Sequence, residues 1–394
     1  MTLEEIDKNF VLQTYARNYI NFVRGENATL FDATNKNYID FTSGIGVVSV
    51  GHGNKRVAEV MCNQVNNITH ISNLYAIEPQ AMCAKKIVEL SGYDMACFFG
   101  NSGAEANEGA IKLARKYGEK KFDNKKFKII TLEHSFHGRT ITTVKATGQS
   151  SMHKPDFAPY PDGFSFNAQL DEVYNAIDNE TVAVMIELVQ GEGGVTPFPK
   201  DAIQKLCKHV QDMGLLFIVD EVQTGVFRTG EFLASNLFEI TPDIITLAKG
   251  AGGGVPIGVV MTKHKDLFVA GDHGSTFGGN YLSTRTALEV CSILEEYKDS
   301  GLLDETLIYF NEALHKFAAN HTDVFGDVVG LGLMRGIRVK DAQTLGKIIS
   351  QGAQEGVLVL KAGKNTLRFL PPLTISTDEI DEGFRRLENA LQNI

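Results

Sequence analysis

The hydrophobic residues in the middle of the chain follow two alternating patterns. Between Asp201 and Met213 the apolar positions recur at helical spacing, and Gly214 stands where a glycine commonly ends a helix. The next residues, 215–219, form an unbroken apolar run that ends at Asp220. Runs that are apolar throughout are typical of strands covered on both faces, as in a parallel sheet, so the alternation predicts a doubly wound α/β fold. Comparable runs occupy residues 128–132, 182–188, 244–247 and 256–261.

The pattern changes along the chain, and the change predicts separate domains. Residues 51–295 carry the helix–strand alternation and are expected to form a large α/β domain with a mostly parallel sheet. Residues 1–50 contain a hairpin-like pattern at 28–32 and 38–41 and are expected to pack with a small C-terminal domain. That small α+β domain is predicted over residues 296–394, from a helical pattern at 303–320 and short strand-like pieces at 328–339, 357–360 and 367–370.

Charge and composition narrow the classes of function. The 394 residues carry a formal net charge of −10 with acids and bases interspersed, which argues against the basic face that nucleic-acid binding requires. No apolar stretch is long enough to span a bilayer, and residues 1–10 lack the apolar region of a signal peptide. The five cysteines are widely spaced and form no Cys-x-x-Cys pair, so we expect neither a disulfide framework nor a zinc site. These features predict a cytoplasmic protein.

Four short motifs follow predicted strands, which is where ligands bind in open α/β sheets. The first, residues 100–107, opens a predicted helix. Ser102 and Glu105 fit a capping box, and the free backbone N–H groups of Gly103 and Ala104 could hold a phosphate. Capping boxes are common, so this motif taken alone also fits a plain capped helix.

The second motif places an acidic pair, Asp220 and Glu221, at the end of a predicted buried strand. A buried carboxylate is costly unless it meets a partner, and a protonated pyridine nitrogen is a suitable one. Such a pairing would keep a pyridine ring in the form that withdraws electrons. A metal ion or a helix N-terminus would also satisfy the carboxylate, so these alternatives stay open for the motif by itself.

The third motif is Lys249, which also follows a predicted buried strand. Partial desolvation at such a position lowers the pKa of a lysine and favours Schiff-base chemistry. An isolated lysine there fits a surface residue equally well. The glycine-rich run 250–254 could suggest a dinucleotide loop, but it lacks the acidic residue that such loops use about twenty positions further on within a βαβ unit.

The fourth motif, residues 135–140, follows another predicted strand. Phe136 could stack on a flat ring, and Arg139 could bind a carboxylate through both arms of its guanidinium group. A core phenylalanine and a surface arginine would explain the same residues. His134 and His137 lie nearby without a further ligand in view, so no metal site is expected.

Together and in this order, the motifs resemble the class III (ornithine-type) aminotransferases of fold type I, which use pyridoxal 5'-phosphate. The resemblance covers nearly the whole chain. Lys249 lies 29 residues after Asp220 (249 − 220), the separation this family uses between the Schiff-base lysine and the partner of the pyridine nitrogen. The matching segments are residues 101–107, 136–140, 190–194, 220–225, 247–250 and 275–280.

The resemblance implies a role for each residue of a cofactor site. Lys249 would bind the cofactor as a Schiff base and move the reacting proton, while Asp220 would pair with the pyridine nitrogen. Phe136 would stack on the ring. Ser102, Gly103 and Ala104 would contact the phosphate. Val222 and Gln223 would lie beside the ring, with Gln223 near its hydroxyl. Thr276 would reach the phosphate from the partner subunit of a homodimer with shared active sites.

The resemblance also implies the residues of a substrate site. Arg139 and Arg368 would bind substrate carboxylates, Glu192 would pair with Arg368, and Ser275 would lie beside the substrate. One segment departs from the family, which usually has a proline and small residues where this chain has Tyr-Leu-Ser-Thr-Arg at 281–285. The helix start and the dimer contact at that segment are therefore less firmly implied than the cofactor site.

Within the class, the chain is most similar to enzymes that act on N-acetylornithine, given its compact length and the segments 19–32, 51–53 and 368–373. This implies transfer of the δ-amine of N2-acetyl-L-ornithine to 2-oxoglutarate, giving N-acetyl-L-glutamate 5-semialdehyde and L-glutamate, a step of arginine biosynthesis. Ornithine, succinylornithine, N-succinyl-diaminopimelate and 4-aminobutyrate remain alternative amine donors. An aminomutase and a nucleotide-binding module without catalysis are more distant alternatives, and the intact Lys249 and Asp220 count against the second.

Overall fold

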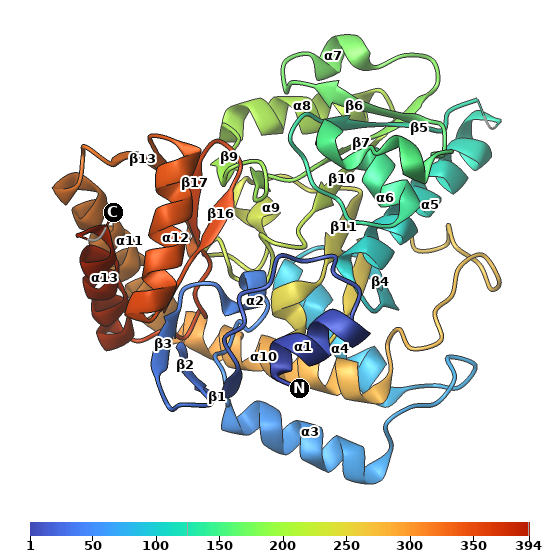
Figure 1. The fold of residues 1–394 in the computed structure, drawn as a ribbon. Coiled ribbons are helices and arrows are strands. Elements are labelled where there is room, and N and C mark those ends of the chain that lie inside the picture. The colour runs from blue at the N-terminus through green and yellow to red at the C-terminus, as the bar shows by residue number, and fades with distance from the viewer. Residues whose placement is uncertain (124, 393) are drawn as a thin grey trace.

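A seven-stranded sheet forms the centre of the molecule in the computed structural model, which describes residues 1–123, 125–392 and 394 (Figure 1). Its strands lie in the order β4-β12-β11-β10-β7-β5-β6. The predicted α/β fold with a mostly parallel sheet is confirmed. The strands are β4 (Ala96–Gly100), β5 (Lys128–Leu132), β6 (Phe164–Ala168), β7 (Thr181–Ile186), β10 (Leu216–Asp220), β11 (Ile244–Leu247) and β12 (Gly258–Thr262).

One strand departs from the predicted direction. The neighbours from β11 to β6 pair in parallel, whereas β12 is antiparallel to both β11 and β4. The apolar run at 256–261 predicted a strand covered on both faces, and every residue of β12 is indeed buried. Burial on both faces produces an unbroken apolar run whatever the direction of the strand, so the parallel orientation expected for this run was wrong.

Helices cover both faces of the central sheet. Apolar residues of α5 (Gly103–Phe122) pack with Met185, and those of α8 (Lys200–Asp212) pack with Ile186. Consecutive strand residues point to opposite faces, so the two helices lie on opposite faces of the sheet. Gly214, just beyond α8, has φ +72°, a left-handed conformation that glycine adopts without steric cost.

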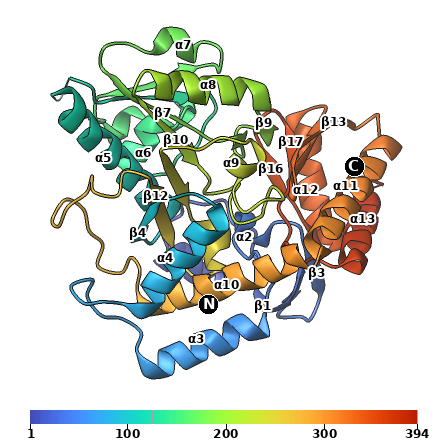
Figure 2. The ribbon, with the colours of Figure 1, turned by 180° about the vertical axis from the view of Figure 1, so that it is seen from behind.

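Three long helices form a further layer beside the sheet. α10 (Tyr281–Asp299) contacts both α3 (Lys55–Asn67) and α4 (Glu78–Ser91), and Figure 2 shows the three side by side. The predicted boundary between residues 295 and 296 falls inside α10, and the division of the chain into three domains remains a prediction.

The last quarter of the chain forms a smaller antiparallel sheet, in the order β13-β14-β17-β16, that packs with helices (Figure 1). Its aromatic core includes Phe310, Phe369 and Phe384, together with Phe41 from the N-terminal region. The elements are α11 (Leu302–Asn320), β13 (Phe325–Leu331), β14 (Met334–Val339), α12 (Ala342–Glu355), β16 (Leu360–Ala362), β17 (Thr366–Phe369) and α13 (Thr377–Leu391).

The N-terminal region joins this part of the molecule through a strand. β1 (Phe22–Glu26), β2 (Thr29–Asp32) and β3 (Asn37–Asp40) form an antiparallel set, and β15 (Val357–Leu358) pairs in parallel with β3. A segment more than 300 residues away in sequence therefore completes the N-terminal sheet, because Ile39 and Val357 are partners in the register.

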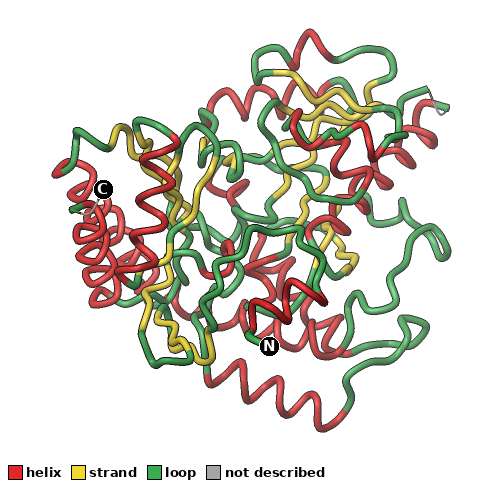
Figure 3. Tube along the Cα trace, in the orientation of Figure 1, coloured by secondary structure: helices red, strands yellow, loops and turns green. Residues whose placement is uncertain are grey.

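The remaining elements are short, and Figure 3 shows them as brief helical or extended pieces within long loops. None of the helices in the described residues is long and apolar enough to cross a membrane. The short elements are α1 (Leu3–Phe10), α2 (Ser43–Gly46), α6 (Ile141–Ala146), α7 (Val173–Ala176), α9 (Ala234–Leu237), β8 (Val189–Gln190), β9 (Thr196–Pro197) and three 3-10 turns, at Ser150–Met152, Pro155–Phe157 and Lys249–Gly252.

Candidate active site

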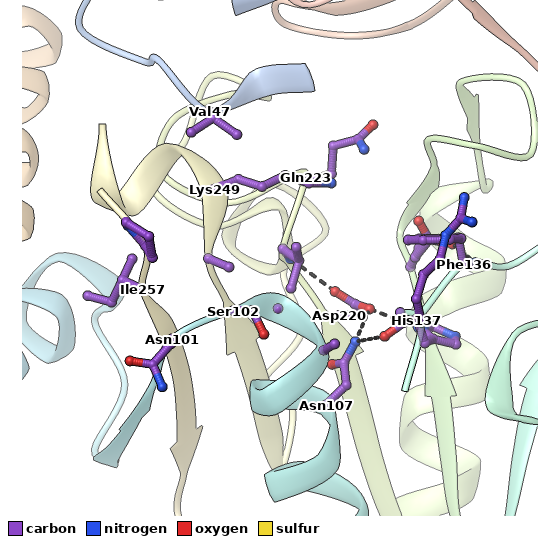
Figure 4. Close-up of a pocket in the computed structure, with 18 of the residues that line it drawn as sticks. Val47, Asn101, Ser102, Asn107, Phe136, His137, Asp220, Gln223, Lys249 and Ile257 are labelled. Carbon is purple, nitrogen blue, oxygen red and sulfur yellow. Dashed lines mark hydrogen bonds and ion pairs between the residues drawn. The ribbon is translucent and has the colours of Figure 1, made fainter. Parts of the chain in front are cut away.

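A cavity of about 410 Å³ lies at the carboxyl edge of the central sheet (Figure 4). β4, β10 and β11 run in one direction, because β12 is antiparallel to both β4 and β11, so the loops after these three strands meet at one edge. This topology brings together segments that lie more than 100 residues apart in the sequence. The predicted site residues that line the cavity are Ser102, Gly103, Ala104, Phe136, Arg139, Asp220, Val222, Gln223 and Lys249.

The N-terminus of α5 opens into this cavity. The Ser102 hydroxyl oxygen accepts a hydrogen bond from the Glu105 N–H at 3.2 Å, which leaves the first two helical N–H groups, of Gly103 and Ala104, without partners inside the helix. One of the two hydrogen bonds of the predicted capping box is absent, because the Glu105 carboxylate does not accept from the Ser102 N–H. The Glu105 carboxylate accepts from the backbone N–H of Asn101 at 2.8 Å instead of that of Ser102, because it turns back one residue further.

Close packing favours glycine at position 103. A Cβ atom there would lie 2.7 Å from a methyl group of Val222, which packs against the start of α5. Gly103 and Val222 therefore approach closely, and both line the cavity. A helix N-terminus of this kind binds anions through its N–H groups and its dipole.

Asp220 forms the floor of the cavity and is only 4% exposed. Its carboxylate accepts from Asn107 Nδ2 at 2.8 Å and from the Val222 N–H at 3.0 Å, and its Oδ2 lies 2.8 Å from His137 Nδ1 (Figure 4). Asn107 is itself fixed by Thr246, whose hydroxyl donates to Asn107 Oδ1 at 2.8 Å. These bonds hold a buried acid in one orientation at the end of β10.

Lys249 stands beside Asp220, at the end of the neighbouring strand β11. Burial lowers the pKa of its amine, the nearby Glu192 opposes this shift, and Arg368 adds to it. Its backbone φ is +44°, in the left-handed region that side-chain-bearing residues rarely occupy, which is typical of a functional position.

Gln223 offers an acceptor that none of the described residues uses. Its Oε1 is buried and has no hydrogen-bond partner in the described residues. A buried acceptor without a donor is costly, so this atom indicates a place for a hydroxyl or another donor of a bound molecule.

Glu192 and Arg368 meet outside the set that lines the cavity. Arg368 Nη1 donates to Glu192 Oε1 at 2.7 Å, and the arginine is 2% exposed while the Glu192 side chain is 32% exposed. Glu192 lies in the loop after β8 and Arg368 on β17, so the pair joins the loop to the smaller sheet. The Gly363 N–H donates to the Glu192 carbonyl at 2.9 Å and reinforces this junction.

Ser275 and Thr276 do not line the main cavity. They line an adjoining one, and Asn101 connects the two by donating from Nδ2 to Ser275 Oγ at 3.1 Å. The departure at 281–285 does not disturb the helix start, because Asn280 caps α10 by accepting from the Ser283 N–H at 3.0 Å.

Sequence reasoning assigned no role to several residues that line the cavity. Asn107 and His137 contact the Asp220 carboxylate, and Glu187 accepts from the Phe136 N–H. Val47 reaches the cavity from the N-terminal region. Glu187 carried a usable signal, since it directly follows an apolar run as Asp220 does. Val47 carried none, because its apolar side chain looks like any core residue. No group of three or more potential metal ligands occurs in the described part of the chain.

Comparison with known proteins decides the family. A family model described as aminotransferase class-III matches residues 12–391. The chain belongs to the class III aminotransferases. It is 56% identical to an acetylornithine aminotransferase of Wolinella succinogenes, over 99% of this chain and 100% of the relative, and 41% identical to one of Aquifex aeolicus, over 97% of this chain and 100% of the relative.

Solved structures of the same family share the fold. An ornithine aminotransferase from Toxoplasma gondii has a TM-score of 0.92 and 28% identity, over 100% of this chain and 96% of that one. An N-acetylornithine aminotransferase from Stenotrophomonas maltophilia has a TM-score of 0.83 and 29% identity, over 99% of both chains. A second structure of the Toxoplasma gondii enzyme is described with partial occupancy of pyridoxal phosphate at its active site. The resemblance inferred from the motifs is thus confirmed.

Proposed function

We propose that this aminotransferase uses pyridoxal phosphate to move the δ-amine of N2-acetyl-L-ornithine to 2-oxoglutarate, giving N-acetyl-L-glutamate 5-semialdehyde and L-glutamate. The observation that carries the proposal is the placement of Lys249 and Asp220 at the ends of neighbouring strands, facing one cavity. The names of the relatives support the choice of acetylornithine as amine donor.

The residues present fit pyridoxal phosphate. The N–H groups of Gly103 and Ala104 suit its phosphate, the Asp220 carboxylate suits its pyridine nitrogen, and the unpaired Gln223 Oε1 suits its ring hydroxyl. Phe136 lines the same cavity and offers a ring to stack on. When bound, the cofactor supplies a protonated ring that withdraws electrons from the carbon next to the amine nitrogen.

Lys249 supplies the nucleophile and the base. Because burial lowers the pKa of its amine, more of the amine is unprotonated at neutral pH than in a lysine exposed to water. We assign two roles to Nζ of Lys249. It attaches the cofactor, and it carries the reacting proton from one carbon atom to the other.

Two arginines can bind the two carboxylate positions that the half-reactions require. Acetylornithine brings its α-carboxylate far from the reacting amine, whereas glutamate brings its α-carboxylate close to it. Arg139, exposed at the cavity wall, can take the distant carboxylate of either substrate. Arg368 can take the near carboxylate of glutamate, and Glu192 neutralises Arg368 while acetylornithine is bound.

We further propose a homodimer with shared active sites. Ser275 and Thr276 line a cavity next to the main one, and Thr276 is exposed in the single chain. A two-fold interface would place each of these segments in the opposite site. Thr276 would then contact the phosphate bound by the partner chain.

A panel of amine donors tests the substrate. Purified enzyme is incubated with 2-oxoglutarate and, in turn, acetylornithine, ornithine, succinylornithine, N-succinyl-diaminopimelate or 4-aminobutyrate, and glutamate formation is measured, with Lys249→Ala as the inactive control. We expect the highest kcat/KM with acetylornithine. A higher value with another donor would replace acetylornithine, and turnover without consumption of 2-oxoglutarate would indicate an aminomutase.

A chemical label tests the role of Lys249 separately. Borohydride reduction of the purified enzyme, digestion and mass spectrometry should place a pyridoxyl group on Lys249. A label on another lysine would contradict the assignment.

A further inference from the structure

Glu187 is a buried carboxylate of the cavity for which neither the motifs nor the proposed reaction supplies a role. It directly follows β7 and is 6% exposed. Ile186 is the register partner of Val219 on β10, so the next residues, Glu187 and Asp220, lie side by side at the carboxyl edge of the sheet. The cavity is thus floored by two neighbouring carboxylates.

The two carboxylates hold two consecutive residues of one loop. Glu187 Oε2 accepts from the backbone N–H of Phe136 at 2.9 Å, and Asp220 Oδ2 lies 2.8 Å from Nδ1 of His137. The loop crosses the cavity wall at this point, and its next side-chain-bearing residue is Arg139. Arg139 has no hydrogen bond or ion pair of its own within the described residues, and its guanidinium carbon lies 5.8 Å from the centroid of the Phe136 ring. Its placement therefore depends on Phe136 and on the backbone of the loop.

We propose that Glu187 is a positioning residue of this enzyme: with Asp220 it clasps the Phe136–His137 pair and so fixes the ring of Phe136 and the guanidinium group of Arg139 over the cavity. What the loop binds rests on the proposed function, whereas the clasp itself does not. Within the described chain, the Phe136 N–H donates only this hydrogen bond. Loss of the bond therefore lets the loop at Phe136 move away from the cavity.

The strength of the clasp should depend on the charge of Glu187. Burial raises the pKa of the Glu187 carboxyl group to about 7. The charge of His137 in the loop and that of Lys249 after β11 oppose this increase, whereas Asp220 at the end of β10 adds to it. An ionised carboxylate accepts a stronger hydrogen bond than a neutral acid. In a local opening of the loop, which breaks this bond while Glu187 stays buried, the hold on the Phe136 N–H should therefore strengthen as the pH rises through about 7.

Hydrogen exchange of the purified enzyme, resolved to the amide of Phe136, tests the clasp directly. In Glu187→Leu the protection factor of this amide should fall by about tenfold, since a buried hydrogen bond is lost. In Glu187→Gln it should stay within about threefold, because the amide oxygen accepts the same bond. Glu133→Gln, the same substitution in the loop after β5 but outside the cavity, is the control and should leave the amide unchanged.

Two more readouts separate the clasp from a general packing role. From pH 6 to pH 8 the protection factor should rise in the wild type and stay flat in Glu187→Gln, a comparison that does not require Glu187→Leu to fold. In Glu187→Leu the KM for 2-oxoglutarate should increase more than kcat falls, because Arg139 is displaced while Lys249 is not.

Unchanged Phe136 protection in both Glu187 variants, or a rise with pH that persists in Glu187→Gln, would overturn the inference. Because amide exchange needs no substrate, this result is independent of whether acetylornithine proves to be the amine donor.

Discussion

At the scale of single residues, the chemistry of the site depends on a few buried ionisable groups. Asp220 is buried, and its carboxylate accepts from Asn107 Nδ2 and the Val222 N–H and lies 2.8 Å from His137 Nδ1. These contacts fix the direction of the carboxylate, the group that the proposed function pairs with a protonated pyridine nitrogen. The support of Asp220 by its neighbours is thus as much a part of the site as Asp220 itself.

Replacing Asp220 by asparagine should therefore reduce turnover without abolishing cofactor binding. An amide cannot stabilise a protonated ring nitrogen, and the loss of one such charge pair corresponds to about 2–3 kcal/mol, or a fall of about 100-fold in kcat. Cofactor absorbance and steady-state kinetics measure the two effects. Asp243→Asn, at a buried carboxylate that does not line the cavity, should lower the melting temperature and spare kcat. Near-normal turnover of Asp220→Asn would show that Asp220 has another role.

Glu187→Gln should stabilise the cofactor-free protein at high pH. Burial raises the pKa of Glu187 to about 7 from its ordinary value of 4.5, so the folded protein keeps a proton that the unfolded chain releases. Ionisation then costs stability, progressively from pH 4.5 to 7 and fully above 7, by up to about 3 kcal/mol. Glutamine cannot ionise and avoids this cost. Urea unfolding should show a gain for the variant at pH 8 and little difference at pH 4.5. An equal gain at both values of pH would contradict this cause.

At the scale of elements, the site is assembled from segments that end at one sheet edge. β17 and the loop after β8 add the pair of Arg368 and Glu192 from outside that edge. The pair joins the smaller sheet to the loop between β8 and β9.

The two half-reactions should respond differently to loss of this pair. Arg368→Ala should slow mainly the half-reaction with glutamate, and Glu192→Ala should favour glutamate over acetylornithine because Arg368 is then always free. Arg139→Ala should slow both, because either substrate brings a distant carboxylate. Stopped-flow measurement of each half-reaction decides the matter. Equal losses in both half-reactions for Arg368→Ala would leave it a structural residue.

The start of α10 offers a test at the same scale. Asn280 accepts from the Ser283 N–H at 3.0 Å and caps the helix in a segment that departs from the family pattern. Asn280→Ala should lower the free energy of unfolding by about 1 kcal/mol, measured by denaturant titration. Asn63→Ala, inside the exposed face of α3, is the matched control and should be neutral or slightly stabilising. Equal effects of the two substitutions would show that the cap contributes nothing.

At the scale of the whole molecule, the proposed dimer makes each site depend on two chains. Lys249→Ala subunits lack the nucleophile, and Thr276→Ala subunits lack the proposed contact across the interface. If sites are shared, one of the two sites in a mixed dimer carries both defects and the other carries neither. Mixing the two variants should restore up to about half of the wild-type activity per mixed dimer. Subunit exchange is first demonstrated, for example by mass spectrometry. If activity does not recover in the exchanged mixture, the result argues against shared sites.

The sequence alone determined the chemistry and the class of fold. Unbroken apolar runs revealed the buried strands, and the motifs that follow them, with Asp220 and Lys249 at the spacing of the family, gave the resemblance to the class III aminotransferases. Local patterns could do this because burial and chemical type are properties of each residue and its near neighbours.

Only the tertiary structure decided how these residues meet. The direction of β12, the neighbouring positions of Glu187 and Asp220, and the arrival of Val47 at the cavity all depend on strand pairing between distant segments. A short apolar run reads the same in either direction, and an acid after a strand does not reveal which strand lies beside it. Register and strand order are set by contacts across the whole chain, so the clasp around Phe136 and His137 became visible only in three dimensions.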